Sequence, residues 1–253
     1  MNRVLHWLDR FFGLALSAAL AMAVLTAWPG AAQAAGNLFG SADLATEARN
    51  VAEFDAVLTR GPDVVVRQGA AVSVSVKADR QLLALLETVV EDTAQGKTLV
   101  LRWKPGSLVT TRHSPVVTIT TPRLAALLVM GSGDVLAEQI SGPRLLARVE
   151  GSGDIKLSGL AVDELKLEIK GSGDIQASGR ATRLAVAIAG SGDVRSTGLL
   201  ADDVSVSIAG SGDASVFADK TLAVSIAGSG DVVYSGNATV RKTVAGSGSV
   251  SKR

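Results

Sequence analysis

The phrase Gly-Ser-Gly-Asp recurs at a nearly constant spacing through the second half of the chain. Its complete copies begin at Gly131, Gly151, Gly171, Gly190, Gly210 and Gly228. A seventh copy begins at Gly246 and has Ser249 in place of the aspartate, and the successive spacings are 20, 20, 19, 20, 18 and 18 residues. A period of this length is typical of stacked-repeat proteins, in which neighbouring repeats bury one another's apolar faces.

Apolar residues alternate with polar or small ones before each phrase. Leu165, Leu167 and Ile169, for example, precede Gly171. Alternation with a period of two predicts a strand with one buried face. A second short alternating segment follows each phrase and ends in a looser turn. The repeat therefore predicts an all-β fold, a right-handed parallel β-helix (solenoid) with about 18–20 residues per rung.

The outward residues of neighbouring repeats support this stacking. Alignment of the phrases places Arg148 beside Glu168 and Glu150 beside Lys170, so opposite charges meet on adjacent rungs. Such cross-strand pairs stabilise a register by roughly 0.2–1 kcal/mol each. The same alignment places Lys242 in an otherwise apolar inward column, as expected for a rung at the end of a solenoid.

The two glycines of each phrase are interpreted as structural turn residues, because a sharp bend commonly needs a positive φ that glycine adopts without strain. These glycines are Gly131, Gly133, Gly151, Gly153, Gly171, Gly173, Gly190, Gly192, Gly210, Gly212, Gly228 and Gly230.

Residues 1–34 have the pattern of a signal peptide. Arg3 and Arg10 precede or flank a long apolar run, and Ala32-Gln33-Ala34 matches a small-residue cleavage site. An uncleaved anchor is the alternative, and membrane contact is expected only in that case. Both interpretations predict export to the periplasm, the outer surface or the extracellular space.

The rest of the chain divides into a leader and one domain. Residues 35–50 are small and polar and predict a flexible leader. Residues 51–253 form the β-helix domain, with irregular N-terminal rungs or a cap over 51–130 and the repeats over 131–253. Within the first part we expect a hairpin around Gln95-Gly96 and a short helical turn over 81–86.

Composition excludes several classes of partner and site. Only 4% of the residues are aromatic and none is cysteine, so disulfides and cysteine-bound metals are excluded. Removal of residues 1–34 takes two of 25 basic and one of 24 acidic residues, which leaves 23 of each. A formally neutral chain does not favour nucleic acid as a partner.

Three features together resemble a known bacterial family. They are the Phe54-Asp55-Ala56-Val57 strand, the Val72-Ser73-Val74 strand and the serial Gly-Ser-Gly-Asp turns. The chain resembles the family named for the head GIN domain of autotransporter adhesins over nearly all of residues 51–253. The resemblance implies an extracytoplasmic β-helix, with adhesion as the family label. We therefore expect a non-enzymatic binding, adhesion or structural module of the cell envelope, whose ligand is an envelope or surface glycan or protein.

The aspartates of the phrases would form a column along the solenoid. At a rung spacing of about 4.8 Å, neighbouring carboxylates repel by roughly 0.9 kcal/mol in water and about 3.5 kcal/mol at an effective dielectric constant of 20. Hydrogen bonds to N–H groups of the turns are the favoured explanation for this arrangement, and calcium between rungs is the alternative. The candidate calcium ligands are Asp134, Asp154, Asp174, Asp193, Asp213 and Asp231.

No residue pattern identifies a catalytic site. A polysaccharide lyase or hydrolase remains an alternative on the architecture alone, but every rung supplies the same carboxylates, whereas a glycosidase needs one distinguished pair. His113 lies in a polar segment without an accompanying nucleophile and is interpreted as an exposed loop residue. We therefore predict no catalytic residue and no cofactor.

The outward positions of the later rungs are small and neutral. A flat sheet face without charges suits close packing against another flat surface, so we expect this face to mediate homo-oligomerisation; simple solvation of small side chains is the alternative. The candidate self-association face comprises Ala187, Ala189, Ser205, Ser207, Ala209, Ser225 and Ala227.

Overall fold

The computed structural model of the chain describes residues 38–39, 43–111 and 113–253. The predicted signal peptide, residues 1–34, lies outside them, as does most of the first half of the predicted leader. Asn37–Arg253 form one compact unit. No helix among the described residues is both long and apolar enough to cross a membrane.

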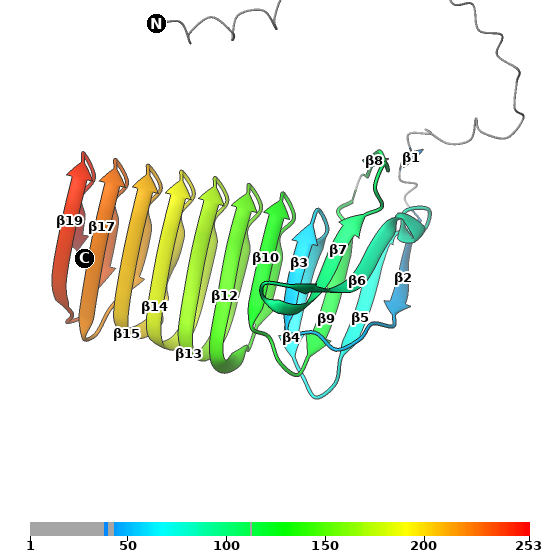
Figure 1. The fold of residues 1–253 in the computed structure, drawn as a ribbon, viewed down its shortest axis with the longest axis horizontal. Coiled ribbons are helices and arrows are strands. Elements are labelled where there is room, and N and C mark those ends of the chain that lie inside the picture. Colours follow the sequence, from blue (N-terminus) through cyan, green and yellow to red (C-terminus); the bar gives the residue numbers. More distant parts are fainter. Residues whose placement is uncertain (1–37, 40–42, 112) are drawn as a thin grey trace, which may run out of the picture. The chain divides into compact units, whose positions relative to one another are not determined.

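The repeats form a right-handed parallel β-helix with two flat sheets (Figure 1). We call the strands that run toward the Gly-Ser-Gly-Asp turns the front sheet and those that leave these turns the back sheet. Three long bent strands supply both sheets: β13 (Ile155–Gly171), β14 (Ile175–Gly190) and β15 (Val194–Gly210). The front sheet also contains β10 (Ala126–Gly131), β12 (Ser141–Gly151), β17 (Thr221–Gly228) and β19 (Thr239–Gly246). The back sheet also contains β11 (Val135–Glu138), β16 (Ala214–Phe217), β18 (Val232–Ser235) and β20 (Val250–Lys252).

The predicted register is confirmed rung by rung. The phrases align with one another, and Val149, Ile169, Ile188 and Ile208 occupy equivalent positions on successive rungs. All four side chains are at most 2% exposed. The outward charge pairs are confirmed as well, because Arg148 lies opposite Glu168 and Glu150 opposite Lys170.

One regular rung precedes the first Gly-Ser-Gly-Asp turn. It consists of β3 (Ala56–Arg60) and β4 (Asp63–Gln68), which pair in parallel with β10 and β11. On their other edges, β3 pairs with β7 (Gly96–Trp103) and β4 with β9 (Val116–Thr121), again in parallel. The parallel solenoid therefore extends two strands per sheet beyond the repeats.

Antiparallel strands end both sheets at the N-terminal side. In the back sheet, β5 (Ser73–Asp79) pairs with β9 and with β2 (Leu44–Arg49). In the front sheet, β6 (Leu86–Thr93) forms a hairpin with β7, as predicted around Gln95-Gly96. The short helical element is a 3-10 turn, η1 (Leu83–Leu85), and a separate two-stranded sheet joins β1 (Leu38–Phe39) to β8 (Val109–Thr110).

The prediction of a flexible leader over residues 35–50 is wrong for its second half. Residues 44–49 form β2, whose backbone pairs along its whole length with β5, and Ala45 packs against the core. The polar sequence of this segment carries no strand pattern of its own. The hydrogen bonds that order it come from a strand about 30 residues further along the chain.

Candidate functional site

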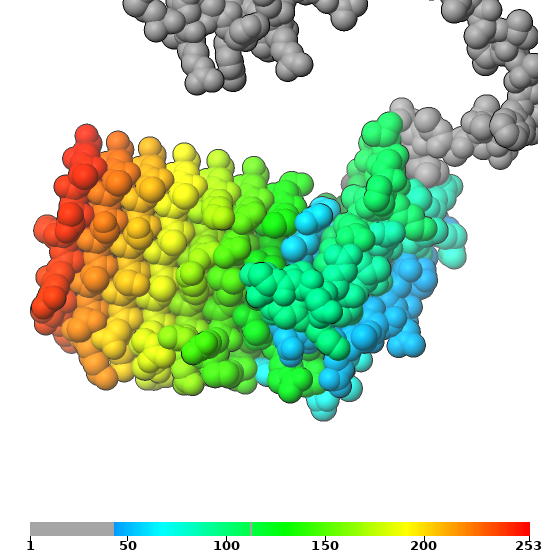
Figure 2. Space-filling model, viewed as in Figure 1, coloured from blue at the N-terminus to red at the C-terminus, as the bar shows by residue number. Residues whose placement is uncertain are grey.

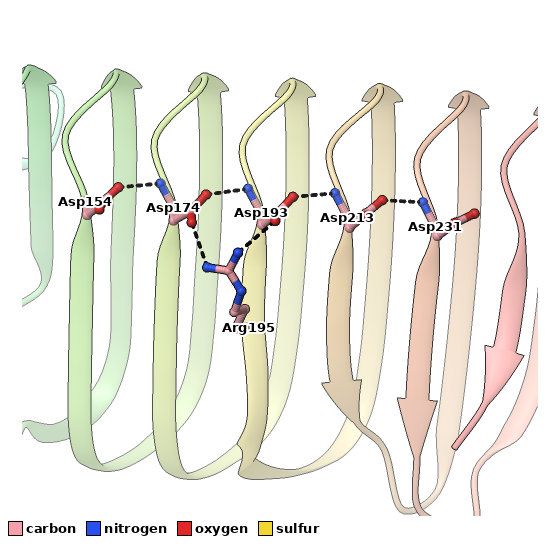
Figure 3. Close-up of polar contacts among 6 residues, drawn as sticks. All are labelled: Asp154, Asp174, Asp193, Arg195, Asp213 and Asp231. Atoms are coloured by element: carbon pink, nitrogen blue, oxygen red, sulfur yellow. Dashed lines mark hydrogen bonds and ion pairs between the residues drawn. The ribbon is translucent and has the colours of Figure 1, made fainter.

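The Gly-Ser-Gly-Asp turns stack into a continuous row of hydrogen bonds along one edge of the solenoid (Figure 3). The Asp174 N–H donates to Asp154 Oδ1 at 2.8 Å, and the Asp193 N–H donates to Asp174 Oδ1 at 2.9 Å. The same bond joins Asp213 to Asp193 and Asp231 to Asp213. Each carboxylate thus accepts a bond from the turn on the next rung, so the repulsion between carboxylates is offset by bonds to backbone dipoles.

The row extends beyond the repeats at both ends. The Asp134 N–H donates to Asp63 Oδ1 at 3.0 Å, so the Gly61-Pro62-Asp63 turn is an additional member that sequence reasoning missed. The sequence signal for this member was an aspartate directly after a Gly-Pro turn. The turn stacks one rung before the first repeat in space, although Asp63 precedes Asp134 by 71 residues in the sequence. At the other end, both the N–H and the hydroxyl of Ser249 donate to Asp231 Oδ1.

Arg195 bridges two members of the aspartate column. Its Nη1 lies 2.6 Å from Asp174 Oδ2 and its Nη2 lies 2.9 Å from Asp193 Oδ2 (Figure 3). The hydrogen bond to Asp174, followed by the charge of Asp174, raises the pKa of the Arg195 guanidinium. Among the described residues, no three His, Cys, Asp or Glu side chains are grouped so that they could hold a metal ion.

The two glycines of the first phrase have different structural reasons, whereas in later copies the first glycine also lies against the preceding turn: a Cβ on Gly151 would lie 2.4 Å from the Gly131 carbonyl oxygen. The first glycine of every complete copy has a positive φ, +113° at Gly131 and between +134° and +143° in the five later copies. The second does not, which corrects the conformational explanation predicted for Gly133. A Cβ on Gly133 would lie 2.5 Å from the carbonyl oxygen of Pro62, and one on Gly153 would lie 2.2 Å from that of Gly133. The second glycine is required by the close approach of the neighbouring turn.

A groove of about 810 Å³ lies on the outer face of the front sheet. Its floor includes Leu146, Ala185, Ser205 and Ala223, and the turn of the β6–β7 hairpin lines it from above through Ala94 and Gln95. Figure 2 shows this hairpin standing out from the front face beside β10 and β12. Lys166 lies in the same row between Leu146 and Ala185, so the floor is small or apolar apart from this one lysine, and the hairpin closes one end.

The hairpin is held over the sheet by a second apolar cluster outside the solenoid core. Leu58, Val100 and Leu128 are 3–6% exposed, and Val89 of β6 and Leu146 of β12 pack against them. Sequence reasoning missed this cluster. The sequence pattern that could have predicted this cluster is a change at the outward positions, from large apolar side chains in the first rungs to alanine and serine in the later ones.

A row of paired charges forms one wall of the groove. Glu164 accepts from Arg144 at 2.9 Å and from Arg183 at 3.0 Å. On the next rungs, Thr221 donates to Asp203 at 2.6 Å. These residues line the groove together with Lys166, so the site combines a small apolar floor with a polar wall of both signs.

The structure places the candidate self-association face on the same side of the molecule. Ser205 belongs to the floor of the groove, and a neighbouring hollow of about 380 Å³ is lined by Ser205, Ser207, Ser225 and Arg241, among others. Ala189, Ala209 and Ala227 are exposed and lie nearer the turns. The predicted face and the groove therefore form one continuous surface.

His113, which the sequence predicts to be an exposed loop residue, and Trp103 both lie away from this surface. His113 is exposed, and its backbone N–H donates to Thr111 Oγ1 at 3.1 Å. Trp103, at the end of β7, packs against the core instead of lining the groove.

Comparison with known proteins finds the same architecture in solved bacterial structures. No curated protein sequence matches the chain. A crystal structure titled a "putative adhesin" from Bacteroides fragilis NCTC 9343 is similar to it with a TM-score of 0.79 and 24% identity, over 86% of this chain and 100% of that one. A "putative lipid binding protein" from Parabacteroides distasonis ATCC 8503 is similar with a TM-score of 0.71 and 24% identity, over the same shares.

A third solved structure, a "putative adhesin" from Parabacteroides merdae ATCC 43184, has a TM-score of 0.69 and 21% identity over 86% of this chain and 99% of that one. At these identities the likeness shows the shared β-solenoid fold. The family model described as "Putative auto-transporter adhesin, head GIN domain" matches residues 53–238. With the stacked turns, the two flat sheets and this match over most of its length, the chain belongs to the head GIN domain family.

Proposed function

We propose that this chain is a non-enzymatic binding module of the bacterial cell envelope, exported through its N-terminal segment. Its working surface is the groove on the outer face of the front sheet, and its ligand is an amphiphile of the envelope or of a neighbouring cell surface. The observation that carries the proposal is the groove itself, an open hollow of about 810 Å³ whose floor is small or apolar apart from Lys166 and which has charges along one wall.

The chemistry of the lining favours an amphiphilic ligand. Leu146, Ala185 and Ala223 offer apolar contact without steric obstruction, which suits a hydrocarbon chain. The Arg144–Glu164–Arg183 row offers hydrogen-bond donors and acceptors to a polar head group at the edge of the same groove. The lipid-binding title of one structural neighbour and the adhesin name of the family both support a binding role.

The experiment fills the groove with bulky side chains. We expect the double variant Ser205→Trp, Ala223→Trp to bind a fluorescent palmitoyl probe at least tenfold more weakly than the unchanged chain in an equilibrium titration, because indole rings would occupy the floor. The matched control is Gln176→Trp, Ser215→Trp, which adds the same two rings to outward positions of the back sheet. The control should bind like the unchanged chain.

The outcomes separate this function from its competitors. Equal loss of binding in both variants, or saturable binding that survives in the groove variant, would show that the groove is not the binding site. Absence of binding to the palmitoyl probe, with saturable binding to a polysaccharide or protein from a cell surface, would replace the ligand class. Chemical turnover of the probe or of a polysaccharide would overturn the non-enzymatic assignment.

A further inference from the structure

The charged groups of the groove are concentrated toward the end that the hairpin closes. Among the described residues that line it, three are basic and two are acidic: Arg144, Lys166, Arg183, Glu164 and Asp203. In register order from β12 to β15, the wall alternates in sign, while Lys166 lies on the floor of β13. On β17, at the other end of the lining, Thr221 and Ala223 carry no charge. The groove therefore has a charged end and a neutral end.

Glu164 is shared between two arginines of the wall. Its Oε2 lies 2.9 Å from Arg144 Nε, and its Oε1 lies 3.0 Å from both Nε and Nη2 of Arg183. One carboxylate thus faces two guanidinium groups, whose side chains are 80% and 56% exposed. Because a guanidinium has five N–H groups, both arginines retain donors that have no acidic partner in the described part of the chain.

Lys166 adds a third cation, on the floor beside this pair. Its side chain is 57% exposed, and its Nζ lies 2.6 Å from Glu168 Oε1. Glu168 also forms an ion pair with Arg148, so this carboxylate too is divided between two bases. Three basic side chains therefore lie on three consecutive strands, and each acidic group that they contact is shared with a second base.

Asp203, the second acidic residue of the lining, does not neutralise this end. It follows Arg183 in the wall, but its Oδ1 accepts a hydrogen bond from Thr221 on the far side at 2.6 Å. Among the described residues, Arg183 forms an ion pair with Glu164 alone. Asp163, which directly precedes Glu164, does not line the groove. The excess of positive charge is therefore local to the groove, although residues 35–253 contain equal numbers of basic and acidic residues.

We propose that the groove selects an anionic amphiphile, whose acid group binds among Arg144, Lys166 and Arg183 and whose hydrocarbon chain extends toward β17. The inference rests on the proposed function of the groove and adds the charge of the head group. The free N–H groups of the three bases donate charge-assisted hydrogen bonds to carboxylate or phosphate oxygens, which a neutral head group does not receive. At a strand spacing of about 4.8 Å, the floor from Ala185 to Ala223 offers about 10 Å of uncharged surface to the chain.

Two probes that differ only in their head group test the preference for an acid. Pyrene-labelled palmitic acid and the matching pyrene-labelled hexadecanol are titrated with the unchanged chain at pH 8, where the acid is ionised. We expect the acid to bind about tenfold more tightly than the alcohol at low ionic strength. Roughly 0.5 M salt should reduce this difference, because the three bases are exposed and their charges are then screened.

Removal of two bases should abolish the preference without weakening the contact with the hydrocarbon chain. The double variant Lys166→Gln, Arg183→Gln should bind the acid as weakly as the alcohol, while its affinity for the alcohol stays that of the unchanged chain. The matched control, Lys156→Gln with Arg180→Gln, removes the same two charges at exposed positions that do not line the groove, and it should keep the preference. Circular dichroism melts and the unchanged binding of the alcohol show that both variants are folded.

The outcomes separate this inference from the function on which it rests. Equal affinity of the unchanged chain for acid and alcohol would overturn the inference and leave the binding function of the groove intact. A preference that persists in the groove variant, or that disappears in the control as well, would overturn it too. Displacement of the acid probe by millimolar butyrate or inorganic phosphate would show that the three bases bind free anions instead of an amphiphile. Binding of neither probe would reject the proposed function and, with it, this inference.

Discussion

At the scale of single residues, hydrogen bonds to the turn of the preceding rung fix the backbone of each turn. The Gly131 carbonyl oxygen accepts from the N–H groups of Ser152 and Gly153, at 2.9 and 3.0 Å, and the Asp154 N–H donates to the Asp134 carboxylate. The backbones of successive turns therefore approach within hydrogen-bonding distance. A side chain at the second glycine would occupy the place of that contact.

The two glycines of the first phrase should consequently differ in their sensitivity to alanine. At Gly131, a Cβ would have open space and only the positive φ is unfavourable, so Gly131→Ala should cost about 1 kcal/mol. At Gly133, a Cβ would lie 2.5 Å from the carbonyl oxygen of Pro62, so Gly133→Ala should cost about 3 kcal/mol, the upper end of ordinary overpacking. Urea unfolding measures both, and equal costs would contradict the distinction.

At the scale of strands, charge pairs across rungs fix the outward face of the early front sheet. Glu168 on β13 has a side chain that is only 12% exposed and contacts both Arg148 on β12 and Lys166 on its own strand. Partial burial, the largest single influence, raises its pKa, but the hydrogen bonds from Lys166 and Arg148 together hold the pKa below its ordinary value. Glu168 is thus favoured in its charged form.

This pKa predicts a pH-dependent contribution to stability. A carboxyl group with a lowered pKa in the folded state stabilises that state above its unfolded pKa, about 4.3 for Glu, and the contribution is lost as the pH falls through the folded value. Glu168→Gln should therefore cost about 1 kcal/mol at pH 7 and less at pH 3. Urea unfolding at both values measures it, with Asp163→Asn, at an exposed position of the same strand, as the control. A cost that does not shrink on acidification would contradict this account.

The strand pattern also shows how much of the fold the sequence predicts. The period of two before Gly171 and the repeated phrases are local, and they gave the parallel stacking, the register and the Arg148–Glu168 pair. The positions of β2 and of β9 were not predictable, because β2 pairs with β5 and β9 lies between β4 and β5 through contacts distant in sequence. The floor of the groove was visible as small outward residues, whereas the overhanging hairpin was not.

At the scale of the whole molecule, one carboxylate row runs the length of the solenoid. It begins at Asp63 and ends at Asp231, and one oxygen of each carboxylate between them accepts a backbone N–H bond from the next rung. Arg195 binds the second oxygens of Asp174 and Asp193. Each rung therefore offers calcium too few oxygens for its usual six to eight ligands.

We expect calcium to leave the stability of the chain unchanged. Thermal midpoints in several millimolar Ca²⁺ and in chelator should agree, because backbone bonds already occupy the carboxylates. Thermal melts followed by circular dichroism measure this, with Mg²⁺ as the control for ionic strength. A midpoint that rises by several degrees in Ca²⁺ and falls in chelator would reinstate the aspartate column as a calcium site.

By itself, the sequence determined what repeats: the two strands of each rung, the inward apolar columns, the alignment of the turns and the family. These features depend on short segments that pair with the equivalent segments of neighbouring repeats, so the pattern of one repeat predicts the contacts of the others. Only the tertiary structure decided the features made once, namely the strand β2, the Asp63 turn and the hairpin over the groove. Each of these depends on contacts between segments that are distant in the sequence. Such contacts stabilise the fold without producing a repeating pattern in the amino-acid sequence.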